Sequence, residues 1–205
     1  MVVMRVRRAG ASALLIECRD GEQVEAWRVE LGRRREAGEL RVVDIVPGAR
    51  TLLLDGVEPG AEELLATWPE PGAAAARDQG PLVEIPTVFD GEDLAGVAEL
   101  WDLTVPAAVE LLATTDFTVA FCGFAPGFAY MRGLGEKFGV PRLDSPRPRV
   151  PAGSVGLAGD YCGIYPTASP GGWRLVGRTE ETLFDVRNEP PARLGPGTRV
   201  RLVPA

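Results

Sequence analysis

The apolar residues of the first 68 positions follow two different periods. Three short runs rich in leucine and β-branched residues predict strands, at residues 13–18, 40–46 and 51–54. Val24, Trp27 and Leu31 recur at helical spacing within residues 24–34, and residues 62–68 predict a shorter helix. Pro47-Gly48 and Asp55-Gly56 supply turns. The order strand, helix, strand, strand, helix predicts a small α/β layer.

Periodicity then stops. Residues 69–81 are rich in Pro, Gly and Ala and predict a linker. We therefore expect two domains, residues 1–80 and 81–205. The second opens with a strand at 82–89, which Pro86 confines to a sheet edge or a strand start. Two helices are expected at 92–103 and 105–112, the first with an apolar stripe that consists of Leu94, Val97, Ala98 and Trp101.

Beyond Asp116 the sequence pattern is typical of a β-barrel. A strand is expected at 118–124, and from Gly123 onward glycine and proline recur between short apolar runs. Residues 155–158 and 162–165 predict a hairpin across Gly159-Asp160. Further strands are expected at residues 174–176, 183–186 and 199–203. Together these features predict an α+β protein that ends in a closed or nearly closed barrel.

Composition narrows the class of function. The 205 residues carry a net charge of -7, which argues against binding of nucleic acid or an anionic membrane. No apolar run reaches the length of a membrane span. The three cysteines, Cys18, Cys122 and Cys162, are widely separated, which is typical of buried thiols in a reducing cytoplasm and not of a metal site or a disulfide framework.

The chain has no histidine, so a general base would have to be a carboxylate. The acidic candidates are Glu84, Asp90, Glu92, Asp93 and Asp144, and their spacing selects none of them. Neither GxxxxGK[ST] nor GxGxxG occurs, so the chain shows no nucleotide site of its own.

The segment GFAPGFAYM, residues 123–131, is the first of three candidate binding segments. Glycines on both sides of a proline allow a sharp turn whose N–H groups can receive an anion. The alternative is a tight barrel corner in which Phe124, Phe128 and Tyr130 pack against one another.

Two further segments contain arginine. Prolines hold Arg142, Arg147 and Arg149 on extended backbone, followed by Pro151-Ala152-Gly153-Ser154. Residues 163–179 carry the turn Ser169-Pro170-Gly171-Gly172, then Trp173, Arg178 and Thr179. Each arginine is suited to a carboxylate or phosphate and is equally consistent with a solvated loop or a surface ion pair. For Trp173 the alternative is plain packing.

The ordered motifs GFAPGFAYM, PRPRVPAGSVGLAG, GIYPTASPGGW and VGRT resemble the allophanate hydrolase subunit 1 family, also called the carboxyltransferase domain C/D family. That family includes the B subunit of 5-oxoprolinase and KipI-type inhibitors of a sensor histidine kinase. The resemblance implies a small α/β N-terminal domain followed by a cyclophilin-like β-barrel.

The resemblance also implies partners. The first is an allophanate hydrolase subunit 2 of related fold, which corresponds to the C subunit of 5-oxoprolinase. In the 5-oxoprolinase group a third, lactam-utilisation subunit is added, and the complex opens 5-oxoproline to glutamate in an ATP-dependent reaction. ATP would then bind in the complex, at a site shared with or held by a partner.

The resemblance implies a pocket in the barrel. Arg149, Ser154 and Arg178 are the expected catalytic residues: the arginines would hold the substrate carboxylate or a phosphoryl intermediate, while Ser154 and the amides near Gly127 and Gly153 would polarise the lactam carbonyl. The expected substrate-binding residues are Phe124, Pro126, Gly127, Phe128, Tyr130, Gly153, Ser169, Gly171 and Trp173. No metal is expected.

Two family features differ here. Members commonly have a histidine on the helix before GFAPGF, where this chain has Leu112-Ala113-Thr114, and a Gly-Pro-Asp-Leu stretch where it has Gly91-Glu92-Asp93-Leu94. Two alternatives to the enzyme subunit are a KipI-like regulator that docks on a histidine kinase and, from the cyclophilin-like fold alone, a prolyl isomerase.

Overall fold

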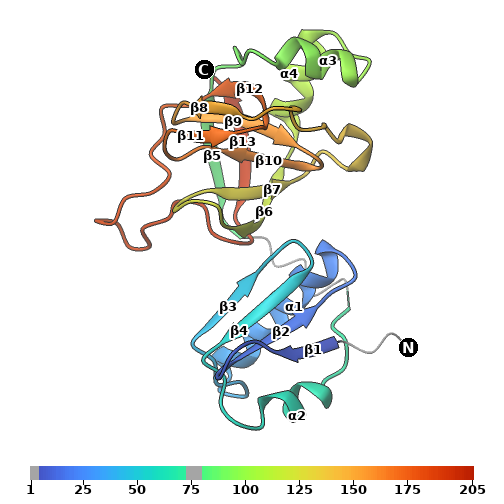
Figure 1. The fold of residues 1–205 in the computed structure, drawn as a ribbon, viewed down its shortest axis with the longest axis vertical. Helices are drawn as coiled ribbons and strands as arrows, with labels where there is room; N and C mark the ends of the chain where they lie inside the picture. The colour runs from blue at the N-terminus through green and yellow to red at the C-terminus, as the bar shows by residue number, and fades with distance from the viewer. Residues whose placement is uncertain (1–4, 73–79) are drawn as a thin grey trace. The chain divides into compact units, whose positions relative to one another are not determined.

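The computed structural model describes residues 5–72 and 80–205, and the chain divides into two compact units, residues 1–79 and 80–205. Figure 1 traces both from blue to red along the chain. Residues 73–79 of the predicted linker lie outside the described residues.

The first unit is a four-stranded antiparallel sheet of order β1-β2-β4-β3 with two helices. Its strands are β1 (Arg5–Arg8), β2 (Ala13–Glu17), β3 (Asp44–Pro47) and β4 (Thr51–Asp55), and its helices are α1 (Gly21–Glu36) and α2 (Ala61–Ala66). Asp20 caps α1 by accepting a hydrogen bond from the Gln23 amide at 2.8 Å. Trp27 and Leu31 pack with Ile16, Leu52 and Leu54 in its core.

The predicted strand at 40–46 is correct only at its end. Leu40 is buried, but the chain enters the sheet only at Asp44. The sequence pattern does not predict β1, because the segment RVRR lacks an apolar run. Its arginines Arg5 and Arg7 instead form ion pairs with Glu17 on the neighbouring strand, at 3.5 and 3.0 Å.

The second unit is a barrel. Its chain order is β5 (Leu82–Thr87), α3 (Leu94–Leu100), α4 (Val105–Thr114), β6 (Phe117–Cys122), β7 (Ala129–Arg132), the 3-10 turn η2 (Glu136–Phe138), β8 (Arg147–Val150), β9 (Ser154–Ala158), β10 (Tyr161–Ile164), β11 (Ser169–Gly171), β12 (Arg174–Arg178) and β13 (Arg199–Pro204). Seven strands form one sheet of order β12-β9-β10-β7-β6-β13-β5. The two helices lie together at one end of the barrel (Figure 1).

The ends of this sheet meet. Val88, just after β5, and Arg178, at the end of β12, exchange two backbone hydrogen bonds of 2.8 and 2.9 Å. The sheet is thereby closed, and the expected α+β fold with a cyclophilin-like barrel is confirmed. The interior is filled by alternating residues of several strands, among them Phe117, Val119, Met131, Val155 and Leu202.

The predicted hairpin is confirmed, since β9 and β10 pair antiparallel from Tyr161↔Ala158 to Ile164↔Val155. Pro86 lies in β5, the last strand of the order, and pairs with Val203 of β13 two residues before the closing bridge at Val88.

The strand predicted at 183–186 is wrong. These residues form a loop joined by one bridge, Phe184↔Ala192. The Asn188 amide donates to the Asp185 carbonyl at 3.0 Å and closes a turn, and Pro190 and Pro191 have no N–H to extend a ladder.

The sequence pattern also does not predict β8 and β11 as strands. They form a separate two-stranded ribbon with pairs Ser169↔Val150 and Gly171↔Arg147. Pro148 and Pro170 break the strand pattern in the sequence, but a ribbon of two strands has only edges, where proline is tolerated.

Candidate functional site

The aromatic residues of the motifs gather on the face of the barrel sheet opposite its interior. Phe128, Tyr165 and Trp173, with Val150 of β8, form a core of their own, which we call the aromatic cluster. The Phe128 ring centroid lies 5.3 Å from Tyr165 and 5.4 Å from Trp173. Phe128 and Trp173 are 1% and 5% exposed, so both serve in packing. Tyr130 is half-buried at the edge of the cluster, 5.0 Å from Phe128.

Glycines fit this cluster closely. A Cβ atom on Gly163 would lie 2.9 Å from the rings of both Phe128 and Trp173. One on Gly171 would overlap the Tyr165 hydroxyl. Burial raises the pKa of Tyr165. The motif glycines of this region therefore allow close packing of aromatic side chains.

Phe124 is the exception among the motif aromatics, because its side chain is exposed. It is 62% exposed and has a φ of 72°, an unfavourable backbone conformation for a bulky residue. The Ala125 amide donates to the Gly123 carbonyl at 2.9 Å, so Phe124 is the centre of a γ-turn with positive φ. Backbone strain of this kind is common at ligand clamps and binding surfaces. Pro126, in the same loop, is also exposed.

Gly127 positions a different segment. Its φ is 83°, and an added Cβ would lie 2.7 Å from the Phe184 Cβ and 3.1 Å from the Leu183 carbonyl oxygen. The buried turn at Gly127 thus supports the chain at residues 183–184.

Gly153 supports the same segment. Its φ is 79°, and an added Cβ would overlap the Thr179 carbonyl oxygen. The Thr179 amide donates to the Gly153 carbonyl at 2.9 Å, and the Gly153 amide donates to the Tyr165 carbonyl at 2.7 Å. The Gly153 amide itself therefore already has an acceptor within the fold, and the expected role in polarising a substrate carbonyl stays a prediction for the amides near it.

Ser154 and Arg178 lie opposite each other on β9 and β12. Ser154 is 6% exposed. The Arg178 guanidinium forms ion pairs with Asp90 at 3.0 Å and Glu180 at 3.5 Å. Arg149 lies on the other sheet, in the exposed part of β8, near Ser169 on β11. The structure brings Ser154 and Arg178 together and places Arg149 on a separate ribbon.

Arg147 is the arginine of its segment that the fold holds most firmly. Its guanidinium donates to both Asp93 carboxylate oxygens at 2.9 and 2.8 Å and to the Trp173 carbonyl at 3.2 Å. Asp93 also accepts from the Leu175 amide at 2.7 Å. The sequence analysis did not select Asp93 from the acidic residues. The one sequence feature that could have selected it is the Gly91-Glu92-Asp93-Leu94 stretch, because its aspartate matches the family pattern Gly-Pro-Asp-Leu.

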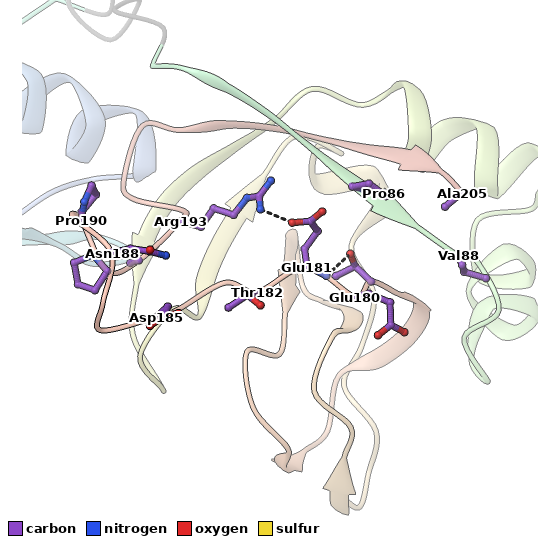
Figure 2. A pocket seen from close by; sticks show the side chains of 13 residues that line it. Pro86, Val88, Glu180, Glu181, Thr182, Asp185, Asn188, Pro190, Arg193 and Ala205 are labelled. Carbon is purple, nitrogen blue, oxygen red and sulfur yellow. Dashed lines mark hydrogen bonds and ion pairs between the residues drawn. The ribbon is translucent and has the colours of Figure 1, made fainter.

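A cavity of about 730 Å³ lies in the second unit and has none of the expected site residues in its lining. Its walls are residues 179–182, parts of 185–193, and Pro86, Val88 and Ala205 (Figure 2). Arg178 precedes this wall by one residue. Gly127 and Gly153 support the wall from behind, at residues 183–184 and 179.

The cavity lining combines apolar residues with a few charged and hydroxyl side chains. Arg193 donates to the Glu181 carboxylate, and the Glu181 amide donates to the Thr179 hydroxyl at 3.2 Å. Hydrogen bonds from Arg187 lower the pKa of Asp185, so this carboxylate stays ionised. Among the described residues of the lining, Glu180, Glu181 and Asp185 face one cation, Arg193. One arginine among three carboxylates does not fit the charge of a nucleoside triphosphate, which calls for several cations.

Residues 5–72 and 80–205 contain neither a candidate metal site nor a candidate membrane-spanning helix. No group of three or more His, Cys, Asp or Glu side chains gathers there in a way that could hold a metal ion. No helix in those ranges is long and apolar enough to cross a membrane.

Several known proteins resemble the chain. It is 38% identical over 212 residues to the B subunit of 5-oxoprolinase from Escherichia coli O157:H7, covering 95% of this chain and 93% of that protein. It is 41% identical over 125 residues to the B subunit of 5-oxoprolinase from Bacillus subtilis, but this match covers only 60% of this chain and 52% of the relative.

Solved structures share the fold. The crystal structure of TTHA0988 matches 95% of this chain with a TM-score of 0.75 and 32% identity, and this match spans 40% of TTHA0988. Kluyveromyces lactis urea amidolyase has the same fold over 98% of this chain, with a TM-score of 0.67 at 18% identity, in 15% of its own length.

A family model covers both units. The model described as carboxyltransferase domain, subdomain C and D, matches residues 4–194, which include every motif discussed above. The chain belongs to the carboxyltransferase domain, subdomain C and D, family.

Proposed function

We propose that this chain is one subunit of a 5-oxoprolinase-type hydrolase, which adds water to the lactam of 5-oxoproline to give glutamate while ATP is hydrolysed. The observation that carries the proposal is the match to a protein named as the B subunit of 5-oxoprolinase, at 38% identity over 95% of this chain and 93% of the relative.

The proposal includes partner subunits. The chain has no histidine and no phosphate-binding loop, and the lining of its cavity does not fit a triphosphate. ATP would therefore be bound by a partner, either a subunit 2 of related fold or a third, lactam-utilising subunit. The chain alone would be inactive.

Arg178 is the expected catalytic residue with the most support, since Thr179 and Glu180 beside it line the cavity. Its exposed ion pairs with Asp90 and Glu180 cost little to exchange for a phosphoryl group. Arg149 is exposed on the β8–β11 ribbon, where a partner subunit or a phosphoryl group can reach it.

The test is reconstitution. The chain, co-purified with its subunit 2 and the lactam-utilising subunit, should release glutamate from 5-oxoproline only when ATP is present, and each protein alone should not. Arg149→Ala and Arg178→Ala should each reduce this release at least about tenfold, which is the loss of one charged hydrogen bond.

Two results would refute the proposal or its parts. A complete complex without turnover that instead blocks autophosphorylation of a sensor histidine kinase would support the regulatory alternative. Unchanged turnover in Arg149→Ala would remove that residue from the catalytic set.

A further inference from the structure

The 179–193 segment contributes most of the cavity lining, and two glycines support its first part. Gly127 and Gly153, both with positive φ, pack against Leu183, Phe184 and Thr179 with no room for a methyl group. Segments with such support do not need to reorder when a ligand enters, and preformed cavities of about 300–1,000 Å³ are the usual small-molecule sites.

The Glu181–Arg193 pair is partly shielded from solvent, as are several other ion pairs of this chain. The two side chains are 29% and 40% exposed, whereas the pair Arg41–Glu58 is 77% and 59% exposed. Figure 2 shows the side chains of Arg193 and Glu181 directed toward each other and joined by a hydrogen bond, from near the two ends of the 179–193 segment. The Thr179 hydroxyl fixes the backbone at Glu181.

The other lining carboxylates have partners outside this pair. Asp185 accepts hydrogen bonds from Arg187, at distances between 2.6 and 3.1 Å, and Glu180 pairs with Arg178 at 3.5 Å. Arg193 is therefore the cation that the described lining offers to a ligand, and Glu181 is the anion nearest to it.

We propose that this cavity binds a small carboxylic acid that also carries an amide or lactam N–H. Arg193 donates to the carboxylate of this ligand, and the ligand N–H donates to Glu181. The ligand carboxylate takes the place of Glu181 on Arg193, so the guanidinium keeps an anionic partner in the bound state. The assignment rests on the proposed function, because it places the substrate class of that reaction here.

The experiment measures KM and kcat for 5-oxoproline in the reconstituted complex. Arg193→Gln should raise KM about tenfold or more, and Glu181→Gln should raise it by about threefold to tenfold, since glutamine still accepts the N–H without the charge. Matched controls are Arg199→Gln, which breaks an ion pair with Asp116, and Glu39→Gln, which breaks one with Arg34. Both controls should leave KM within about twofold.

A charge exchange separates binding from a purely structural role. The double variant Glu181→Arg with Arg193→Glu keeps an ion pair and should retain the thermal midpoint of the native chain. If the pair binds substrate, KM remains raised at least about tenfold. A normal KM in this variant, or in Arg193→Gln, would overturn the assignment.

Direct binding distinguishes this assignment from the proposed function. In the isotope-labelled full chain, 5-oxoproline should shift the amide resonances of residues 179–193, and 2-pyrrolidinone, which lacks the carboxylate, should shift them much less. Shifts without any turnover by the complex would refute the proposed function and leave the cavity assignment standing. Turnover without such shifts, and with normal KM in both single variants, would refute the cavity assignment alone.

Discussion

The aromatic cluster and the 179–193 segment belong to the same unit but are built from different kinds of residue. The cluster contains the most distinctive motif residues, and Phe128 and Trp173 are almost wholly buried in it. The segment has ordinary polar residues and lines a cavity of about 730 Å³. In this protein the most distinctive motifs belong to the closely packed aromatic cluster. The surface that is available to a ligand is formed by the less distinctive 179–193 segment.

Removing the Phe128 ring should cause the largest loss of stability among the changes considered, because Phe128 is at the centre of the packed region. Phe128→Ala should lower the free energy of unfolding by about 4 kcal/mol, because it leaves a cavity in a closely packed cluster. Phe124→Ala, at a side chain that is 62% exposed, should cost much less. Urea unfolding of both variants measures the difference. Equal losses would mean that the cluster does not pack as described.

The link between the two regions can be tested at Gly153. Gly153→Ala should destabilise the chain by about 3 kcal/mol, from backbone strain at positive φ together with overlap on Thr179. Gly159→Ala is the control, since its φ of 57° is also positive but nothing lies within 4 Å of the added Cβ, so only the strain of about 1 kcal/mol should remain. Similar thermal midpoints for the two variants would show that Gly153 does not support the cavity wall.

A substitution of Asp93 tests whether its ion pair with Arg147 holds the β8–β11 ribbon in place. Asp93→Ala leaves Arg147, a partly buried guanidinium, with the exposed carboxylate of Glu92 at 2.6 Å and should cost about 2 kcal/mol. Asp90→Ala removes an exposed ion pair and should cost less than about 1 kcal/mol. Chemical denaturation gives both values. A small loss in Asp93→Ala would mean that packing alone holds β8 in place.

The smallest effect is expected at the strained turn. Phe124→Gly and Phe124→Ala both remove the ring, but only glycine tolerates a φ of 72° without strain. The glycine variant should therefore be more stable than the alanine variant by about 1 kcal/mol. Calorimetry of the pair isolates this strain from the ring contacts. If the alanine variant is the more stable, the turn is not strained.

Much of the fold could be predicted from local pattern. The β9–β10 hairpin was specified by two apolar runs on either side of Gly159-Asp160, and α1 by the spacing of Val24, Trp27 and Leu31. The β8–β11 ribbon could not be predicted in this way, because prolines are excluded from most strands and tolerated only at edges. Where an edge lies is decided by tertiary structure.

The candidate site was less predictable. The sequence correctly marks Gly127 as a turn residue and names Gly153 for a ligand, yet both support a neighbouring segment, and the Gly153 amide has an acceptor within the fold. Glu181 and Arg193 had no sequence signal, since the loop that joins them brings them together only in three dimensions. Asp93 could have been selected from the acidic residues by its family pattern alone.

The junction between β5 and β12 limits the size of the residue that can stand at position 177. Two hydrogen bonds at Val88 and Arg178 close the cylinder, and a Cβ on neighbouring Gly177 would lie 2.6 Å from the Val88 carbonyl oxygen. A methyl group at residue 177 would therefore force the backbone at Val88 to shift, next to the two hydrogen bonds that close the sheet. Growth of a side chain at this position would act directly on the seam of the barrel.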